Sequence, residues 1–164
     1  MHSLLKQFTQ REAHPAIQFI KYGIAGGVAT AVNIVLFYVC AWQVLPALNP
    51  ADPVVTHLHL HVGAITDAVR GSHARFDNYI AFVFANLVAY LLNIYWVFKP
   101  GRHHPVIEIA LFYAVSGVSM VIGTGLMEYL IKHYGLVTTV AFGANLVTAL
   151  LINYGMRKFV IFKG

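Results

Sequence analysis

Four long apolar stretches with very few charges occupy most of this 164-residue chain. A helix needs about 20 largely apolar residues to cross the hydrocarbon core of a membrane. A chain this short cannot bury four helices that are apolar all round inside a water-soluble bundle. The pattern therefore predicts an all-α integral membrane protein with a single transmembrane domain over residues 1–164. The four expected transmembrane helices are Ile17 to Leu45, Tyr79 to Phe98, Ile107 to Leu130 and Gly135 to Phe162.

The composition supports a membrane as the main solvent of the chain. Charged residues make up 10% of it and hydrophobic residues 59%, whereas soluble domains carry roughly 25% charged residues. Cys40 is the only cysteine, which excludes an internal disulfide, a CxxC redox pair and a cysteine-based metal site. The chain has no nucleophile elbow, phosphate-binding loop or paired-carboxylate motif. We therefore expect no enzyme, no cofactor, no metal and no nucleic-acid partner.

Lysine and arginine are distributed unequally between the two predicted sides of the membrane, and this bias sets orientation. Both termini are therefore expected in the cytoplasm, with the long connector 46–78 outside the inner (cytoplasmic) membrane. The cytoplasmic set is Lys6, Arg11, Lys21, Lys99, Arg102, Arg157, Lys158 and Lys163, and the opposite set is Arg70, Arg75 and Lys132.

The second half of the chain repeats elements of the first. Ala85-Asn86-Leu87-Val88 recurs as Ala144-Asn145-Leu146-Val147, and Tyr95-Trp96-Val97-Phe98-Lys99 has a counterpart in Phe159-Val160-Ile161-Phe162-Lys163. Aligning the final lysines and aligning the asparagine motifs give registers that differ by five residues, and both remain open. Each half would run in, out and in again. We therefore expect a duplicated, parallel two-helix hairpin with a pseudo-two-fold axis along the membrane normal.

Several of these features together resemble the GtrA-like family of small four-span membrane proteins. They are the entry Gln18-Phe19-Ile20-Lys21-Tyr22-Gly23, Asn33 within the first span, and the basic-aromatic exit from Asn153-Tyr154 to Lys163. The resemblance implies a role in cell-surface polysaccharide synthesis or glycosylation. It also implies that the chain flips a polyprenyl-phosphate-linked sugar across the membrane beside a partner glycosyltransferase. The chain departs from strict internal symmetry where Asn93 stands opposite Arg157.

Three cations are expected at a similar depth, just inside the cytoplasmic interface. They are Lys21, Arg157 and Lys158, and together they would suit a phosphate or pyrophosphate, because a guanidinium can bind two oxygens at once. The alternative is that these long side chains reach the headgroups and bind no ligand.

Amide side chains inside the spans need partners, either on other helices or on the hydroxyls of a sugar. The candidates for a polar path are Asn33, Asn86, Asn93, Asn145 and Asn153. Gly23, Gly27 and Ala31 form a small-residue face on the first span, so we also expect a homo-oligomer.

The connector is rich in histidine, at His57, His59 and His61. Leu58, Val62, Ile65 and Val69 recur at helical spacing, which predicts a short amphipathic helix on the outer leaflet that ends at Gly71. We interpret the histidines as solvated interfacial residues.

The function expected from these patterns is translocation of a polyprenyl-phosphate monosaccharide. No predicted span carries an acidic residue in its middle, so facilitated movement is expected rather than pumping. A membrane scaffold that positions a glycosyltransferase is the main alternative, and a small multidrug exporter is a weaker one.

Overall fold

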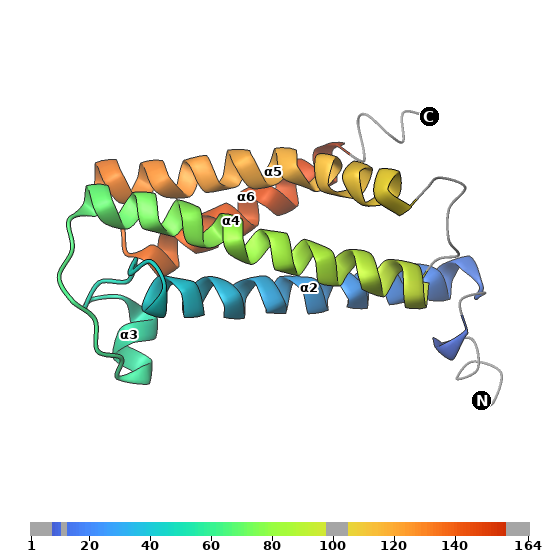
Figure 1. Cartoon of the computed structure of the whole chain (residues 1–164), viewed down its shortest axis with the longest axis horizontal. Helices are drawn as coiled ribbons and strands as arrows, with labels where there is room; N and C mark the ends of the chain where they lie inside the picture. Colours follow the sequence, from blue (N-terminus) through green and yellow to red (C-terminus); the bar gives the residue numbers. More distant parts are fainter. Residues whose placement is uncertain (1–7, 11–12, 98–104, 157–164) are drawn as a thin grey trace.

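The computed structural model describes residues 8–10, 13–97 and 105–156. The helices in these ranges carry the labels used in Figure 1. They are α2 (Pro15–Gln43), α3 (Pro53–Leu58), α4 (Asp67–Leu92), the π-helix η1 (Asn93–Val97) that continues α4, α5 (Pro105–Tyr134) and α6 (Thr138–Met156). The prediction of an all-helical architecture is confirmed for the described residues.

The long helices run alternately up and down as a bundle (Figure 1). Helix α2 packs along α4, α4 along α5, and α5 along α6. The connector with α3 and the turn from α5 to α6 lie at one end, which we call the connector end. The other end, where α2 begins and α4 gives way to α5, is called the junction end.

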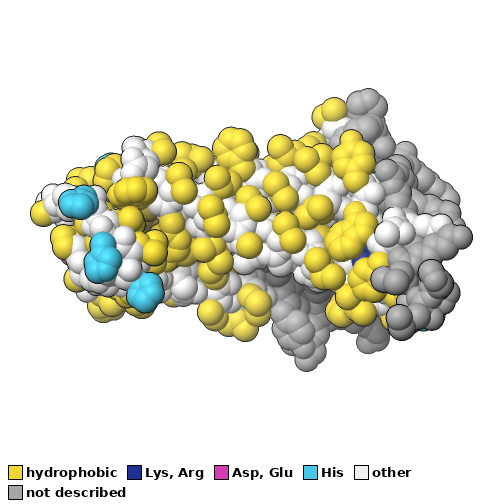
Figure 2. All heavy atoms as spheres, turned by 90° about the horizontal axis from the view of Figure 1, so that it is seen from below, with side chains coloured by type: hydrophobic (Ala, Val, Ile, Leu, Met, Phe, Trp, Pro, Cys, Tyr) yellow, Lys and Arg dark blue, Asp and Glu magenta, His cyan; other side chains and the backbone are white. Residues whose placement is uncertain are grey.

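The surface of the bundle is apolar along its length, as an integral membrane protein requires. Three helices are long and apolar enough to span a membrane, over Ala16–Gln43, Asp67–Val97 and Phe112–Tyr134, and a shorter apolar helix covers Thr138–Ile152. Large side chains such as Phe19 and Leu150 are about three-quarters and two-thirds exposed, respectively. Figure 2 shows hydrophobic side chains along one whole face, with histidines gathered at one end. The chain is therefore a helical membrane protein.

The connector folds differently from the amphipathic helix that its spacing predicts, and that prediction is wrong. Helix α3 ends at Leu58, and His59 follows with a left-handed φ of 52°. Helix α4 begins at Asp67, capped by Thr66, and runs through Gly71 without a break. Gly71 is needed there because an added Cβ would lie 2.7 Å from the Cγ of Lys132 on α5. The glycine allows close packing of α4 on α5 rather than ending a helix.

Asp52 attaches the connector to the start of α6. Its carboxylate accepts hydrogen bonds from the backbone N–H of Val54 at 3.0 Å and of Thr139 at 2.9 Å, so it caps the N-termini of α3 and α6 together. The Thr139 hydroxyl also donates to Asp52, and Thr138 donates to the carbonyl of Ala47. These contacts fold the connector over the connector end.

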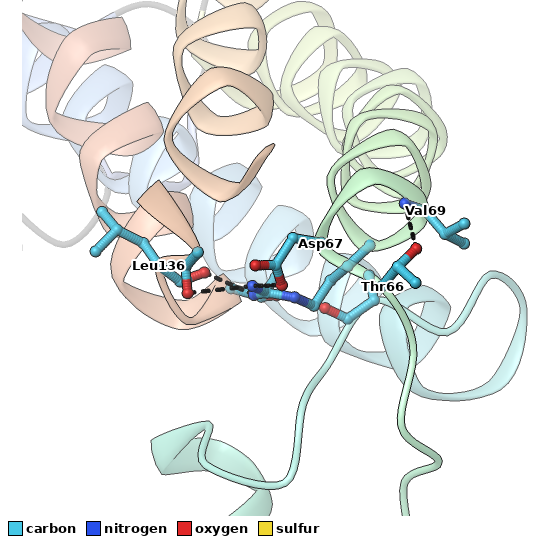
Figure 3. A network of polar contacts seen from close by, with 8 residues as sticks. Thr66, Asp67, Val69 and Leu136 are labelled. Carbon is cyan, nitrogen blue, oxygen red and sulfur yellow. Dashed lines mark hydrogen bonds and ion pairs between the residues drawn. The ribbon is translucent and has the colours of Figure 1, made fainter. Parts of the chain in front are cut away.

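Arg70 makes a second set of contacts at this end. Figure 3 shows this region, with Asp67 at the start of α4 and Leu136 in the turn between α5 and α6. The guanidinium is fully buried and donates to the carbonyls of Leu136 at 2.6 Å and Gly135 at 3.2 Å. It also bonds Asp67 Oδ1 at 2.7 Å and Thr138 Oγ1 at 3.3 Å. One side chain of α4 therefore supplies donors to the turn that joins α5 to α6.

A buried apolar cluster fills the bundle beneath the connector, and we call it the connector-end core. Phe37 of α2 and Phe142 of α6 stack within it, with ring centroids 3.8 Å apart. Its members come from the four long helices and from the connector, so it ties the connector to the bundle. They are Phe37, Ala41, Ala47, Leu48, Val55, Ala74, Ala81, Met127, Ile131, Ala141 and Phe142.

Candidate functional site

A cavity of about 170 Å³ lies between the four long helices, on the junction side of the connector-end core, and it is not enclosed. Its apolar lining includes Ala29, Phe82 and Met120. Its polar lining consists of four amides and three hydroxyls, which is unusual inside a bundle whose outer surface is hydrocarbon-like. They are Asn33, Asn78, Asn86, Asn145, Thr30, Ser116 and Ser119.

Asn86 is the most informative of these residues, because its amide nitrogen is buried and has no hydrogen-bond partner in the described part of the chain. Its Oδ1 lies 3.1 Å from the hydroxyl of Ser116, which also lies 2.7 Å from the carbonyl of Phe112. An unpaired buried donor costs about 1–3 kcal/mol. A ligand oxygen that reached this nitrogen would therefore stabilise the side chain.

Two other amides are held in place by packing and hydrogen bonding. Asn78 Nδ2 donates to Thr124 Oγ1 at 2.6 Å, a buried bond between α4 and α5. Asn145 approaches α5 so closely that a Cβ at Gly123 would lie 2.3 Å from its Oδ1. Gly123 is thus the position at which α5 makes room for Asn145.

The internal repeat is visible in the lining of this cavity. Asn86 and Asn145, which are equivalent in the Ala-Asn-Leu-Val motif, both line it. The alignment of final lysines would instead place Asn86 opposite Leu150, which is 68% exposed. The geometry favours the motif register.

The predicted polar residues divide between the cavity and other places. Asn33, Asn86 and Asn145 line the cavity. Asn93 does not, because it begins the π-helix and its Nδ2 donates to the carbonyl of Ala89 at 2.7 Å. Asn153 lies in α6, but its side chain is outside the described part of the structure.

The predicted phosphate-binding cations are described only at Lys21. Its buried ammonium donates to the carbonyl of Gln10 at 2.9 Å and lies 5.3 Å from the centre of the Trp96 ring, within cation–π range. Trp96 in turn donates to the carbonyl of Phe8 at 2.7 Å. Arg157 and Lys158 lie outside the described residues.

Sequence reasoning did not identify Asn78, Thr30, Ser116 and Ser119 as cavity residues. Asn78 falls just outside the span predicted to begin at Tyr79, while α4 begins at Asp67. Serine and threonine in a helix are weak indicators of a polar cavity, because their hydroxyls often donate to a backbone carbonyl one turn earlier. Thr30 and Ser116 do so, to Gly26 at 3.0 Å and Phe112 at 2.7 Å.

The fold and the cavity together define a multi-pass helical membrane protein with a polar intramembrane site. The model of the family GtrA/DPMS, transmembrane domain, matches residues 21–162, and the chain belongs to this family. Membership assigns the chain a role in lipid-linked sugar and polysaccharide biosynthesis. Members are generally non-catalytic. A search of curated proteins and a search of solved structures each gave no match.

Proposed function

We propose that the protein translocates a polyprenyl-phosphate-linked monosaccharide across the cytoplasmic membrane, with the sugar passing through the cavity. The observation that carries this proposal is the unpaired amide of Asn86 beside a cavity whose lining includes several amides and hydroxyls, inside an apolar bundle. The amide nitrogen has no acceptor within the described chain. Sugar hydroxyls and ring oxygens could supply one. The lipid tail would remain in the bilayer, along the exposed apolar side chains of the bundle.

The size of the cavity supports a single sugar unit. Pockets that enclose drug-sized ligands measure roughly 300–1,000 Å³, and this one measures about 170 Å³. A monosaccharide head group is therefore a better match than an oligosaccharide.

The phosphate would be held toward the junction end. Lys21 lies about two helical turns from Ala29 of the cavity lining, on the same helix. Its ammonium has three N–H donors, of which one is used by Gln10. Arg157 and Lys158 complete the phosphate site in this proposal, and the charge bias between loops would place the junction end in the cytoplasm.

The architecture proposed for this function is a duplicated parallel hairpin of four spans, formed by α2 with α4 and α5 with α6. The packing of α2 on α4 and of α5 on α6 supports it. Gly23 and Gly27 have open space beyond them, which leaves that face of α2 available for a second copy of the chain. The other partner proposed is a membrane glycosyltransferase.

Replacing Asn86 with leucine should weaken binding of a polyprenyl-phosphate monosaccharide about tenfold, within a range of about five- to a hundredfold, because a sugar oxygen left without its donor costs about 1–3 kcal/mol. Asn93→Leu is the matched control, since Asn93 is also a buried asparagine but lies outside the cavity. Binding would be measured by titrating the lipid-linked sugar into purified protein in nanodiscs.

Equal binding by the Asn86→Leu and Asn93→Leu variants would contradict a sugar site in this cavity. If Asn86→Leu kept full binding but lost association with a glycosyltransferase, the scaffold role would be the better account. The asparagines would then serve helix packing.

A further inference from the structure

Asp77 is a buried acid that the proposed sugar and phosphate sites do not use. It lies in α4, about three turns after Asp67, and its side chain is fully buried. Neither carboxylate oxygen has a hydrogen-bond partner in the described part of the chain. The sequence placed Asp77 in the connector, and the expectation that no span holds a deep acid therefore needs correction for α4.

Asp77 lies at the level of the connector-end core. Ala74 and Ala81, one turn away on each side along the same face of α4, both belong to that core. The neighbour of Asp77 in the chain, Asn78, lines the cavity itself.

The charged and titratable groups near this carboxyl come from three helices. On α4 itself, His73 lies one turn before Asp77 and its Nδ1 is 2.8 Å from the carbonyl oxygen of Pro46. From α2, the Cys40 thiol is close enough to interact electrostatically with Asp77. From α5, Glu128 is already paired with Arg75 at 2.9 Å and Lys132 at 2.6 Å. The described part of α6 from Thr138 to Ile152 has no acidic, basic or histidine side chain.

A carboxylate ion in such a place loses its hydration without gaining a partner, whereas the neutral acid loses much less. Acidic residues inside membrane helices commonly mark proton or ion pathways for this reason. In this protein the proton-bound acid is compatible with a dry, closed core. The ion would require water around it and would open the packing between α2, α4 and α6.

We propose that Asp77 is a proton-binding site that couples opening of the connector-end core to loss of a proton. With the proton bound, the core is dry and the cavity is closed toward the connector end. When Asp77 releases its proton to water, the charge draws water into the core. A polar head group can then pass. This inference rests on the proposed function only for the identity of the head group that crosses the core. Its test needs no lipid-linked sugar.

Cys40 provides a natural probe, because it is buried on α2, the helix that packs along α4, and is the only cysteine. The experiment measures the rate at which a small water-soluble methanethiosulfonate labels Cys40 in full-length protein in lipid nanodiscs, from mildly acidic to alkaline pH. The wild type is compared with the Asp77→Asn variant, which is nearly isosteric and carries no charge at any pH.

The two rates should agree at acidic pH, and at alkaline pH the wild type should be labelled about tenfold faster, as expected for an opening equilibrium shifted by about 1.4 kcal/mol. Direct repulsion between the Asp77 carboxylate and a Cys40 thiolate predicts the opposite result, in which the wild type is labelled more slowly than the Asp77→Asn variant at alkaline pH. A rate ratio of one or less at every pH would overturn the proposal.

Infrared spectroscopy of the wild type tests the proton itself and does not depend on the variant folding. Labelling aspartate with carbon-13 separates its carbonyl band from that of glutamate. We expect a neutral aspartic acid band at neutral pH that disappears as the pH rises. A protein with no neutral aspartic acid at any pH in this range would exclude Asp77 as a proton-binding site.

Discussion

Replacing Arg70 with alanine should lower the free energy of unfolding by about 3–5 kcal/mol, because two backbone carbonyls lose charge-assisted hydrogen bonds and a large buried side chain is removed. The change would leave the carbonyls of Gly135 and Leu136 without their donor and would remove the partner of Asp67. It would also leave a void at a fully buried position.

Arg75→Ala is the matched control for this prediction, because Arg75 is the same residue type on the same helix. Its side chain is 36% exposed and it pairs with Glu128, so its loss should cost no more than about 1 kcal/mol. Both values would come from reversible unfolding in mixed detergent micelles. Similar losses for the two variants would show that Arg70 does not organise the turn between α5 and α6.

The second large effect is expected at Asp52, where alanine should cost about 2–4 kcal/mol, since two helix caps and a buried charge-assisted hydrogen bond are lost together. Asp52 accepts from Val54 at the start of α3 and from Thr139 at the start of α6. Asp52→Asn retains one acceptor oxygen and should lose about half as much. The same unfolding experiment measures both variants, and a neutral Asp52→Ala would mean that the connector is not anchored through this residue.

Much of the fold could be predicted from hydropathy, because apolar surface along a whole helix has no alternative to lipid in a chain of this size. The start of α4 could not be predicted in this way. The charged residues Arg70 and Asp77 led to the prediction that the first turns of α4 belong to the connector. Both side chains are buried only through tertiary contacts, with the α5–α6 turn and the connector-end core. Local sequence does not encode those contacts.

The candidate site could be predicted in part from the asparagines in the apolar stretches. Amides in apolar helices point to a polar interior, and Asn33, Asn86 and Asn145 do line one cavity. Asn93 lies seven residues after Asn86, a spacing that would place both on one face of a regular α-helix. Asn93 nevertheless lies about 10 Å farther along the helix axis, beyond Ala89 at the end of the α4 lining, and its Nδ2 is bonded to the carbonyl of Ala89.

The central claim is that the protein moves a lipid-linked sugar through this cavity, and a flipping assay tests it most directly. Liposomes carrying a labelled polyprenyl-phosphate monosaccharide in both leaflets would be treated with a membrane-impermeant reagent that modifies the sugar. Without protein, only the outer-leaflet sugar should react. With the wild-type protein, nearly all of it should react.

The Asn86→Leu variant should slow the second phase of this reaction about tenfold or more, the effect of losing roughly 1.4 kcal/mol or more of binding, while Asn93→Leu should behave as the wild type does. If the wild-type protein left the inner-leaflet sugar as protected as in protein-free liposomes, the translocation account would be contradicted.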